Sequence, residues 1–214
     1  MSVYLEIDPT YPKSRSLEKV VRVIQDGGVI VYPTDSVYAL GCKLSTKSAL
    51  NRIRRIRKLS EKHQFTIMCN DLSSLSKYAL VSNRAYRILK AHTPGPYTFI
   101  LKARPRVPRH LMYVKKRTIG VRVPETSIAS RLVSMLGEPI LSTSLILPSS
   151  DIPLASPYDI RLELDNSVDL IVAGGEGGSQ PTSVIDLAGD IPRIQRKGLG
   201  EVTDFKFLDN DIIR

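Results

Sequence analysis

An apolar run that ends at a proline and passes directly into small polar side chains places the strongest constraint on how this chain folds. Residues 29–32 are all β-branched or aromatic, which is typical of a buried strand. Pro33 ends the strand because it has no N–H for a sheet ladder. Thr34, Asp35 and Ser36 follow at the mouth of the strand, where polar groups are well placed to meet a ligand. A turn capped by its own side chains explains these three residues equally well.

Apolar strands and amphipathic helical stripes alternate along the rest of the chain. The pattern predicts helices over residues 16–27, 46–54, 72–80, 83–92 and 127–136. It predicts strands over residues 29–32, 65–69, 97–103, 118–123, 140–146, 169–173, 183–187 and 191–196. Because short links join the later strands, we expect an α/β fold with a mixed parallel and antiparallel sheet. The 214 residues are expected to form one domain, 1–214, with its core between about residues 15 and 200.

Composition excludes several classes of protein. No window approaches the roughly 20 apolar residues of a membrane span, and the first ten residues lack the pattern of a signal peptide. The two cysteines, Cys42 and Cys69, make no disulfide framework and are expected to be buried thiols in a reducing cytosol. The three histidines are scattered, so the sequence predicts no metal site. We therefore expect a cytoplasmic protein that is not bound to a membrane.

Positive charge is concentrated in two segments of a chain whose formal net charge is +10. Residues 47–62 hold seven lysines and arginines against one glutamate, and residues 102–117 hold seven and no acid. Such local basicity is typical of a polyanion site, although a solvated face that keeps the protein soluble is the alternative. The side chains expected to contact RNA phosphates are Arg52, Arg54, Lys58, Lys115, Lys116 and Arg117. Nearby aromatic residues belong to strand patterns, so we expect recognition of double-stranded RNA or tRNA by shape and phosphate.

The stretch from Pro33 to Gly41 resembles the P-T-D-[ST]-x-Y-[AG]-L-G signature of the YrdC-like proteins, the threonylcarbamoyl-AMP synthase family. Further matches follow in the order of the family: R-I-R at 55–57, P-G-P-Y-T at 94–98, T-I-G-V-R-V-P at 118–124, S-T-S at 142–144, P-T-S-V-I-D at 181–186 and R-K-G at 196–198. The variants at 35–36, 39 and 142–144 are most similar to the YciO branch. This resemblance covers almost the whole chain and implies a single twisted, open, mixed sheet with flanking helices and a concave face.

The resemblance also implies a substrate set and a site. It implies contacts to L-threonine from Thr34, Arg122 and Thr182, and contacts to the nucleotide from Arg55, Arg57, Thr118, Ser142, Ser144 and Arg196. ATP is then a substrate that carries Mg²⁺, beside L-threonine and bicarbonate, and no cofactor is tightly bound. The threonine carbamate attacks the α-phosphate and releases pyrophosphate, which needs positioning and cationic stabilisation but no catalytic acid, base or nucleophile. YrdC-like proteins are also described as RNA-binding, and we expect a monomer.

The spacing of the arginines at 55–57 leaves their role open. On an ideal helix Arg57 falls within the apolar stripe of Leu50 and Ile53, where an unpaired guanidinium is costly. Arg55 points nearly the opposite way, so both serve one ligand only if the helix stops near residue 54. Alternatively, both are helix-end arginines that cap carbonyl groups. Arg55 also stands at the lysine of the family's K-x-R pair, and this replaces a point charge with a planar fork.

Arg122 interrupts an apolar strand. The alternation of its apolar neighbours turns Arg122 to the opposite face, together with Thr118 and Gly120. An arginine there is suited to bidentate contact with a carboxylate. We predict that one cavity is lined by Thr34, Arg57, Thr118, Arg122, Ser142 and Arg196.

Two positions depart from the family pattern. Ser144 stands where most members have asparagine, and it offers one donor instead of two. Cys69 stands where some relatives have a substrate-contacting histidine. We therefore expect a YciO-type relative of threonylcarbamoyladenylate synthase that binds ATP and threonine better than it forms the adenylate for tRNA t6A modification. The alternative is a double-stranded RNA- or tRNA-binding protein without efficient catalysis. The glycine-rich run at 174–178 lacks the residues of a P-loop and is expected to be a flexible turn.

Overall fold

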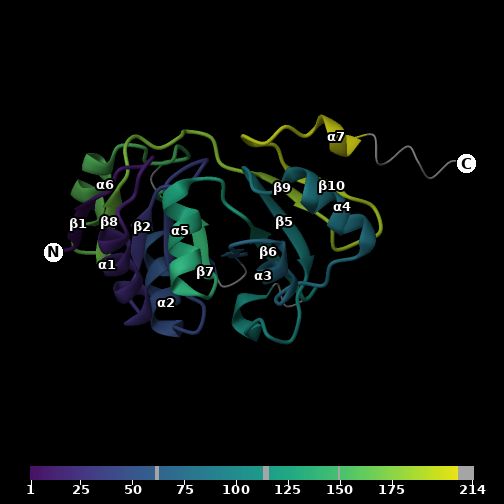
Figure 1. Cartoon of the computed structure of the whole chain (residues 1–214), viewed down its shortest axis with the longest axis horizontal. Helices are drawn as coiled ribbons and strands as arrows, with labels where there is room; N and C mark the ends of the chain where they lie inside the picture. Colours follow the sequence, from purple (N-terminus) through teal and green to yellow (C-terminus); the bar gives the residue numbers. More distant parts are fainter. Residues whose placement is uncertain (61–62, 113–115, 149, 207–214) are drawn as a thin grey trace, which may run out of the picture.

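The computed structural model describes residues 1–60, 63–112, 116–148 and 150–206, and Figure 1 shows its strands side by side in a twisted sheet. In this part of the chain one sheet of ten strands has the order β1-β8-β2-β3-β7-β4-β6-β5-β9-β10. The strands are β1 (Val3–Glu6), β2 (Ile30–Tyr32), β3 (Ala39–Lys43), β4 (Thr66–Met68), β5 (Tyr97–Lys102), β6 (Thr118–Arg122), β7 (Ile140–Ser144), β8 (Leu170–Ala173), β9 (Ser183–Asp186) and β10 (Arg193–Arg196).

The sheet combines parallel and antiparallel pairs. Strands β1, β8 and β2 run parallel, and β2, β3, β7 and β4 alternate in direction. Beyond them, β4 pairs parallel with β6 and β5 pairs parallel with β9, whereas the β6–β5 and β9–β10 pairs are antiparallel. The prediction of a single mixed sheet is therefore confirmed.

Helices cover the two faces of this sheet unequally. The helices are α1 (Ser14–Gln25), α2 (Lys47–Ile56), α3 (Leu72–Ser76), α4 (Asn83–His92), α5 (Ser127–Leu136), α6 (Pro157–Leu164) and α7 (Thr203–Lys206), with a 3-10 helix η1 (Arg109–Leu111). Helices α1 and α5 pack into one apolar cluster, and α2, α3, α4 and α6 pack into a larger one on the opposite face. Gly137 ends α5 with a left-handed φ of 71°, in agreement with its predicted place after the helix.

The alternation of strand side chains leaves part of one face open. On β4, Ile67 belongs to the larger cluster while Thr66 points to the face of α1 and α5. On β5, Phe99 belongs to the larger cluster, while Thr98 points to the face of α1 and α5. Beyond β7 in the sheet, Met68 is the only described residue of the smaller cluster. Helices α1 and α5 therefore cover the β1–β7 half of this face, whereas side chains of β6, β5 and β9 on it line a cavity.

Five described elements were not predicted from the sequence. They are β1, β3, η1, α6 and α7, and β3 begins within the Pro33–Gly41 stretch. Val31 of β2 lies opposite Leu40 of β3, so the polar residues of this stretch form the loop between two paired strands. Several boundaries also differ; the helix predicted over 72–80 ends at Ser76, and the helix predicted over 46–54 continues to Ile56.

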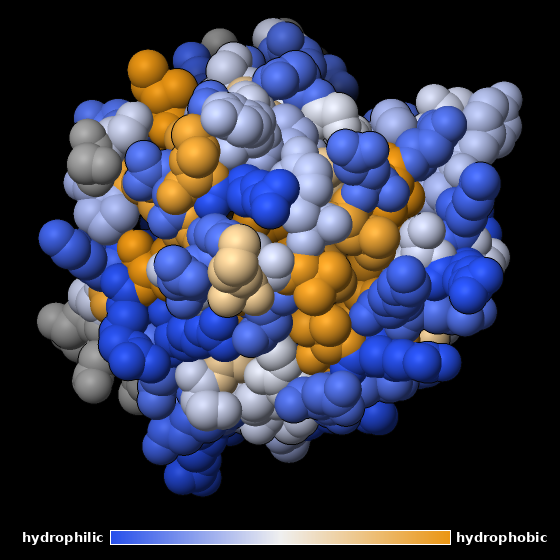
Figure 2. All heavy atoms as spheres, turned by 90° about the vertical axis from the view of Figure 1, so that its left-hand side faces the viewer, coloured by the Kyte–Doolittle hydropathy of each residue, from blue (hydrophilic) through white to orange (hydrophobic). Residues whose placement is uncertain are grey.

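The end of the molecule that carries β1 and α6 exposes apolar side chains among charged ones (Figure 2). Val3, Tyr158 and Leu162 are exposed there. Single exposed apolar residues are normal on a protein surface. None of the described helices is both long enough and apolar enough to cross a bilayer.

Candidate functional site

The open part of the sheet face holds a cavity of about 220 Å³. Side chains reach it from β3, β7, β4, β6, β5, β9 and β10, which are consecutive strands of the sheet. The predicted site residues that line it are Thr34, Arg57, Arg122, Ser142, Ser144, Thr182 and Arg196. The fold thus brings together residues that lie up to 162 positions apart in the sequence numbering from Thr34 to Arg196.

The loop between β2 and β3 supplies Thr34. Its Oγ1 donates to the carbonyl oxygen of Val37 at 2.7 Å and lies 3.2 Å from Oγ of Ser36. The backbone N–H of Ser36 donates to Oγ1 of Thr34 at 3.3 Å. The loop is therefore capped by its own side chains, as one interpretation of the sequence predicted, and its Thr34 lines the cavity.

Arg122 enters the cavity from β6 and forms a buried ion pair. Its side chain is 7% exposed, and Nη2 donates to Oδ1 of Asp35 at 2.6 Å. Nη1 donates to Oγ of Ser36 at 3.2 Å. Nε of Arg122 and Oδ2 of Asp35 are buried and have no hydrogen-bond partner within the described residues. Buried charged atoms rarely stay unpaired, so this pair marks a place where a ligand has polar atoms to satisfy.

Arg57 follows α2 as its C-cap residue and crosses to β7. Its Nε donates to the carbonyl oxygen of Ile146 at 2.9 Å, and its Nη1 donates to Oγ1 of Thr143 at 2.6 Å. The guanidinium therefore bonds to the end of a neighbouring strand. Partial burial, with a smaller contribution from Arg196, lowers the pKa of Arg57 to about 10, so it stays charged at neutral pH.

Arg196 lies at the rim of the cavity on β10. Its Nε and Nη2 donate to the carbonyl oxygen of Thr182 at 3.0 and 2.8 Å, and Nη2 also donates to Oγ1 of Thr182 at 3.2 Å. The Thr182 hydroxyl lies 2.9 Å from Oγ1 of Thr98 on β5. Partial burial and the charge of Arg122 lower the pKa of Arg196. Arg196 and Thr182 thus form one connected unit at this rim.

The three arginines Arg57, Arg122 and Arg196 therefore face one cavity, which we call the arginine cavity. No Asp or Glu is among the described residues that line it, and the one carboxylate paired with these arginines is Asp35, behind Arg122. Guanidinium groups held this close repel one another unless an anion joins them. Their planar forks match carboxylate and phosphate oxygens, so the arginine cavity is suited to a polyanionic ligand.

Hydroxyl groups of β7 complete one wall of the arginine cavity. Ser142 lies 2.8 Å from the buried hydroxyl of Tyr32, and Ser144 is the last residue of the strand. Thr143, which was not predicted as a site residue, accepts the hydrogen bond from Arg57. Its place between two predicted serines was the only signal for it in the sequence.

His63 also lines the arginine cavity and was not predicted. Its Nε2 lies 3.3 Å from Oγ1 of Thr143, and its ring meets the ring of Phe65 edge-to-face at 5.1 Å between centroids. Burial, followed by the charges of Arg57 and Arg54, lowers the pKa of His63 to about 4, so the imidazole is neutral at neutral pH. A lone histidine after a helix gives no pattern from which this position could have been found.

Two residues carried over from the family lie outside the arginine cavity. Arg55 is in the last turn of α2 and is exposed, because the helix does not stop near residue 54. The structure therefore corrects the prediction that Arg55 serves one ligand with Arg57. Thr118 shares a face with Arg122 but lies farther along β6, at a second cavity of about 430 Å³. Its placement with the arginines is likewise corrected, although its hydroxyl is buried without a partner in the described part of the chain.

Cys69 is buried in the larger apolar cluster and does not line the arginine cavity. Burial raises the pKa of its thiol to about 12, so the thiol stays neutral. The cysteine thus fills core volume and provides no ligand contact of its own. Cys42 is likewise a free, buried thiol.

The glycine-rich run at 174–178 packs against the loop between β2 and β3, which we call the signature loop. The run is therefore not merely a flexible turn. The hydroxyl of Tyr38 donates to the carbonyl oxygen of Gly175 at 2.7 Å and accepts from the N–H of Gly174 at 3.1 Å. A Cβ at Gly178 would lie 2.0 Å from the carbonyl oxygen of Ser36. Only glycine allows the two backbones to approach this closely. The run therefore supports the loop that carries Thr34.

The predicted RNA-contacting residues are only partly available. Arg52 forms an ion pair with Asp169, in which Nη1 donates to Oδ2 at 2.7 Å. The guanidinium of Arg54 lies over the ring of Phe65. Lys58 is exposed, and Lys115 falls outside the described residues.

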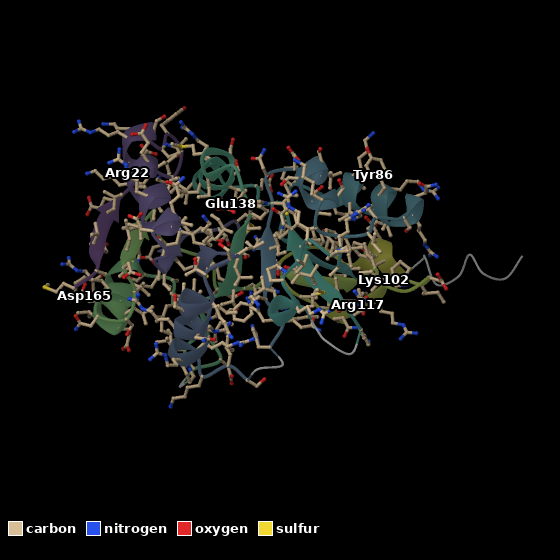
Figure 3. The ribbon with its side chains drawn as sticks, turned by 90° about the horizontal axis from the view of Figure 1, so that it is seen from below. Arg22, Tyr86, Lys102, Arg117, Glu138 and Asp165 are labelled. Atoms are coloured by element: carbon tan, nitrogen blue, oxygen red, sulfur yellow. The ribbon has the colours of Figure 1, made fainter. Side chains whose placement is uncertain are left out.

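An exposed basic cluster remains at the end of the 102–117 segment. Lys116 and Arg117 are exposed, and Figure 3 shows Arg117 beside Lys102 of β5. Lys102, Lys116 and Arg193 line the second cavity. We call Lys102, Lys116, Arg117 and Arg193 the basic cluster. Among the described residues, no group of three or more His, Cys, Asp or Glu side chains is placed to hold a metal ion.

Comparison with known proteins identifies the family. Residues 22–198 match the Sua5/YciO/YrdC family, which is described as "Telomere recombination". The chain belongs to this family. It is 51% identical to the YciO protein of Escherichia coli strain K12 over 205 residues, which are 96% of this chain and 100% of that protein. It is 34% identical to the threonylcarbamoyl-AMP synthase of Nitrosococcus oceani over 157 residues, which are 73% of this chain and 84% of that protein.

Solved structures agree with this membership. The crystal structure of E. coli YciO superposes with a TM-score of 0.93 at 51% identity and covers 96% of this chain and 100% of that one. P. abyssi Sua5 complexed with L-threonine superposes with a TM-score of 0.88 at 23% identity and covers 97% of this chain and 61% of that one. At that identity the Sua5 superposition shows a shared fold. The recognition of a YrdC-like fold from the sequence is confirmed.

Proposed function

We propose that this protein binds ATP and L-threonine in the arginine cavity and, with bicarbonate, joins them as threonylcarbamoyl adenylate. The observation that carries the proposal is the convergence of Arg57, Arg122 and Arg196 with the Thr34 loop on one cavity. Two relatives support it, since the N. oceani protein is a threonylcarbamoyl-AMP synthase and P. abyssi Sua5 was solved with L-threonine. The product would supply the threonylcarbamoyl group for t6A modification of tRNA.

Each group then has a chemical task. Arg122, fixed by Asp35, holds the carboxylate of threonine, while Thr34 and Thr182 lie near enough to meet its other polar groups. Arg57 and Arg196 hold phosphate oxygens as the carbamate oxygen attacks the α-phosphate and the bond to pyrophosphate breaks. Because no carboxylate among the described residues lines the cavity, Mg²⁺ arrives on the nucleotide. Ser144 in place of asparagine and the exposure of Arg55 are reasons to expect that the protein binds its substrates better than it turns them over.

Replacing Arg57 with glutamine is expected to weaken ATP binding by roughly 10- to 150-fold, because a hydrogen bond to a charged group is worth about 1.5–3 kcal/mol. Arg55→Gln is the matched control, since it removes the same charge from the exposed side of α2. Its ATP affinity should stay within about twofold of the wild type. Isothermal titration calorimetry measures both. Equal losses in the two variants would show that ATP responds to general charge and not to the arginine cavity.

Binding of double-stranded RNA or tRNA is a second candidate function. It is favoured by the basic cluster, whose exposed side chains border the same open face of the sheet as the arginine cavity. Contacts of this kind read phosphates and shape, and they do not require Arg52 or Arg54, which already have partners.

Changing Lys102, Lys116 and Arg117 together to glutamine is expected to weaken RNA binding and to reduce the slope of log affinity against log salt by up to about three phosphate contacts. The control changes Arg15, Lys19 and Arg22 of α1 to glutamine, which removes the same charge from another part of the surface; Figure 3 shows Arg22 far from Lys102 and Arg117. Salt-dependent binding of duplex RNA checks both. If the control loses as much affinity as the basic-cluster variant, the RNA contact is not local to this face.

A further inference from the structure

His63 is an ionisable side chain in the arginine cavity that the proposed chemistry does not use. It lies between α2 and β4, with its ring packed edge-to-face on Phe65. Its Nε2 is 3.3 Å from Oγ1 of Thr143, the hydroxyl that also accepts from Nη1 of Arg57 at 2.6 Å. Because Arg57 can only donate, the hydrogen of the Thr143 hydroxyl is free to point at Nε2 of His63. The network therefore suits a neutral imidazole in the empty cavity.

The same contact also accommodates a protonated imidazole. A hydroxyl oxygen has two lone pairs, so Thr143 can accept from Arg57 and from a protonated His63 after its own hydrogen rotates away. The change of charge state thus needs a rotation of one hydroxyl and no movement of the backbone. The added proton sits on Nε2, while the second ring nitrogen, which already carries a hydrogen in the neutral imidazole, now donates from a positively charged ring in a cavity suited to anions.

Burial, and then nearby positive charge, keeps His63 neutral while the cavity is empty. The charged groups that face it are Arg57 and Arg54 from α2, and β7 and β4 contribute the uncharged Thr143 and Phe65. Its chain neighbours 61 and 62 lie outside the described residues. Burial and the two arginines together lower the pKa of His63 to about 4. A ligand that outweighs these positive charges removes the electrostatic part of that lowering, while the part due to burial remains.

Phosphate ligands differ in whether they outweigh the arginines. Among the described residues, the cavity sets three arginines against the single carboxylate of Asp35, and Arg54 adds a further positive charge near His63. A nucleoside monophosphate roughly balances this surplus near neutral pH, whereas a triphosphate carries roughly twice as much negative charge and exceeds it. Of the two, the triphosphate free of Mg²⁺ is therefore expected to reverse the sign of the local field at His63.

We propose that His63 is a phosphate-binding residue that takes up a proton when a nucleoside triphosphate occupies the arginine cavity, and so favours triphosphate over monophosphate. The proposal rests on the proposed binding of ATP in this cavity. Mg²⁺ on the triphosphate cancels about two of its negative charges, so the preference is expected for the nucleotide free of Mg²⁺. The preference strengthens as the pH falls from about 6.5 towards 5, where free histidine is protonated but His63 of the empty cavity is not.

Calorimetry at pH 5.5 without Mg²⁺, in two buffers of different ionisation enthalpy, tests this by counting protons taken up on binding. The wild type should take up a measurable fraction of a proton more with ATP than His63→Gln does, and this difference should be much smaller with AMP. His110→Gln is the matched control, because burial, Lys47 and Arg54 also lower the pKa of that imidazole but it does not line the arginine cavity. It should behave as the wild type.

The outcomes separate the two proposals. ATP binding with the same proton uptake in wild type and His63→Gln overturns the role of His63 and leaves the proposed function standing. No ATP binding at millimolar concentration overturns both. A measurement on the wild-type protein alone tests the proposal even if the His63→Gln variant fails to fold. Proton-detected NMR should show one imidazole with a strongly lowered pKa, which rises on addition of ATP and not of AMP; an unchanged value contradicts the proposal.

Discussion

Replacing Arg122 with glutamine is expected to abolish threonine-dependent adenylate formation and to lower the free energy of unfolding by about 3–5 kcal/mol. The side chains of Arg122 and Asp35 are 7% and 9% exposed and meet at 2.6 Å, so the substitution strands a buried carboxylate. It also removes the guanidinium that we assign to the threonine carboxylate. Urea unfolding measures the stability, and adenylate analysis by mass spectrometry measures the activity.

A second substitution separates these two effects. Adding Asp35→Asn to Arg122→Gln removes the stranded charge, so the double variant should recover much of the lost stability. It should not recover adenylate formation, because the carboxylate of threonine still lacks its arginine. Recovery of both by the double variant would show that Arg122 serves the fold alone and does not contact the substrate.

Replacing Gly178 with alanine is expected to lower the free energy of unfolding by about 1–3 kcal/mol and to weaken threonine binding at the same time. The new Cβ would lie 2.0 Å from the carbonyl oxygen of Ser36, so the backbone of the signature loop must move. That loop carries Thr34, and its Ser36 hydroxyl accepts from Arg122. Displacement of the loop therefore disturbs two of the proposed threonine contacts together.

Gly189→Ala is the matched control for Gly178→Ala. A Cβ at Gly189 meets no atom within 4 Å, so its stability and its threonine affinity should stay close to those of the wild type. Thermal unfolding and threonine titration check both variants. If Gly178→Ala binds threonine as the wild type does, the loop and the glycine run are not coupled in the way that the structure indicates.

The positions of some site residues could be predicted from strand patterns in the sequence. Arg122 breaks an apolar alternation, so its face was predictable from residue spacing. Thr34 follows a proline that ends a strand, which placed it correctly at a strand mouth. These inferences succeed because side chains alternate across a strand with a fixed period of two. The resemblance to YrdC-like proteins then indicated which strand ends converge.

Contacts across long sequence distances could not be predicted in the same way. Arg57 bonds to Ile146 and Thr143, and nothing local to α2 indicates that its guanidinium crosses to β7. The end of α2 also lies two residues beyond the prediction, which turned Arg55 to solvent. His63 gains its significance from arginines on α2 and not from its own neighbours in sequence.

Two local patterns were misleading for physical reasons. The β3 residues include alanine, glycine and lysine and no β-branched side chain, so the strand gave little signal although β2 and β7 pair with it on both sides. The glycine-rich run had the composition of a flexible turn. Its glycines serve instead for close approach to Tyr38 and Ser36, which becomes visible only when both segments are in place.

The most direct test of the proposed function is incubation of the wild-type protein with ATP, Mg²⁺, L-threonine and bicarbonate, followed by mass spectrometry for threonylcarbamoyl adenylate and measurement of pyrophosphate. We predict that both products form in equal amounts, that omission of either threonine or bicarbonate stops them, and that turnover is slower than that of a synthase with asparagine at the position of Ser144. Absence of the adenylate under conditions in which calorimetry shows ATP bound would contradict the assignment of this cavity to adenylate formation.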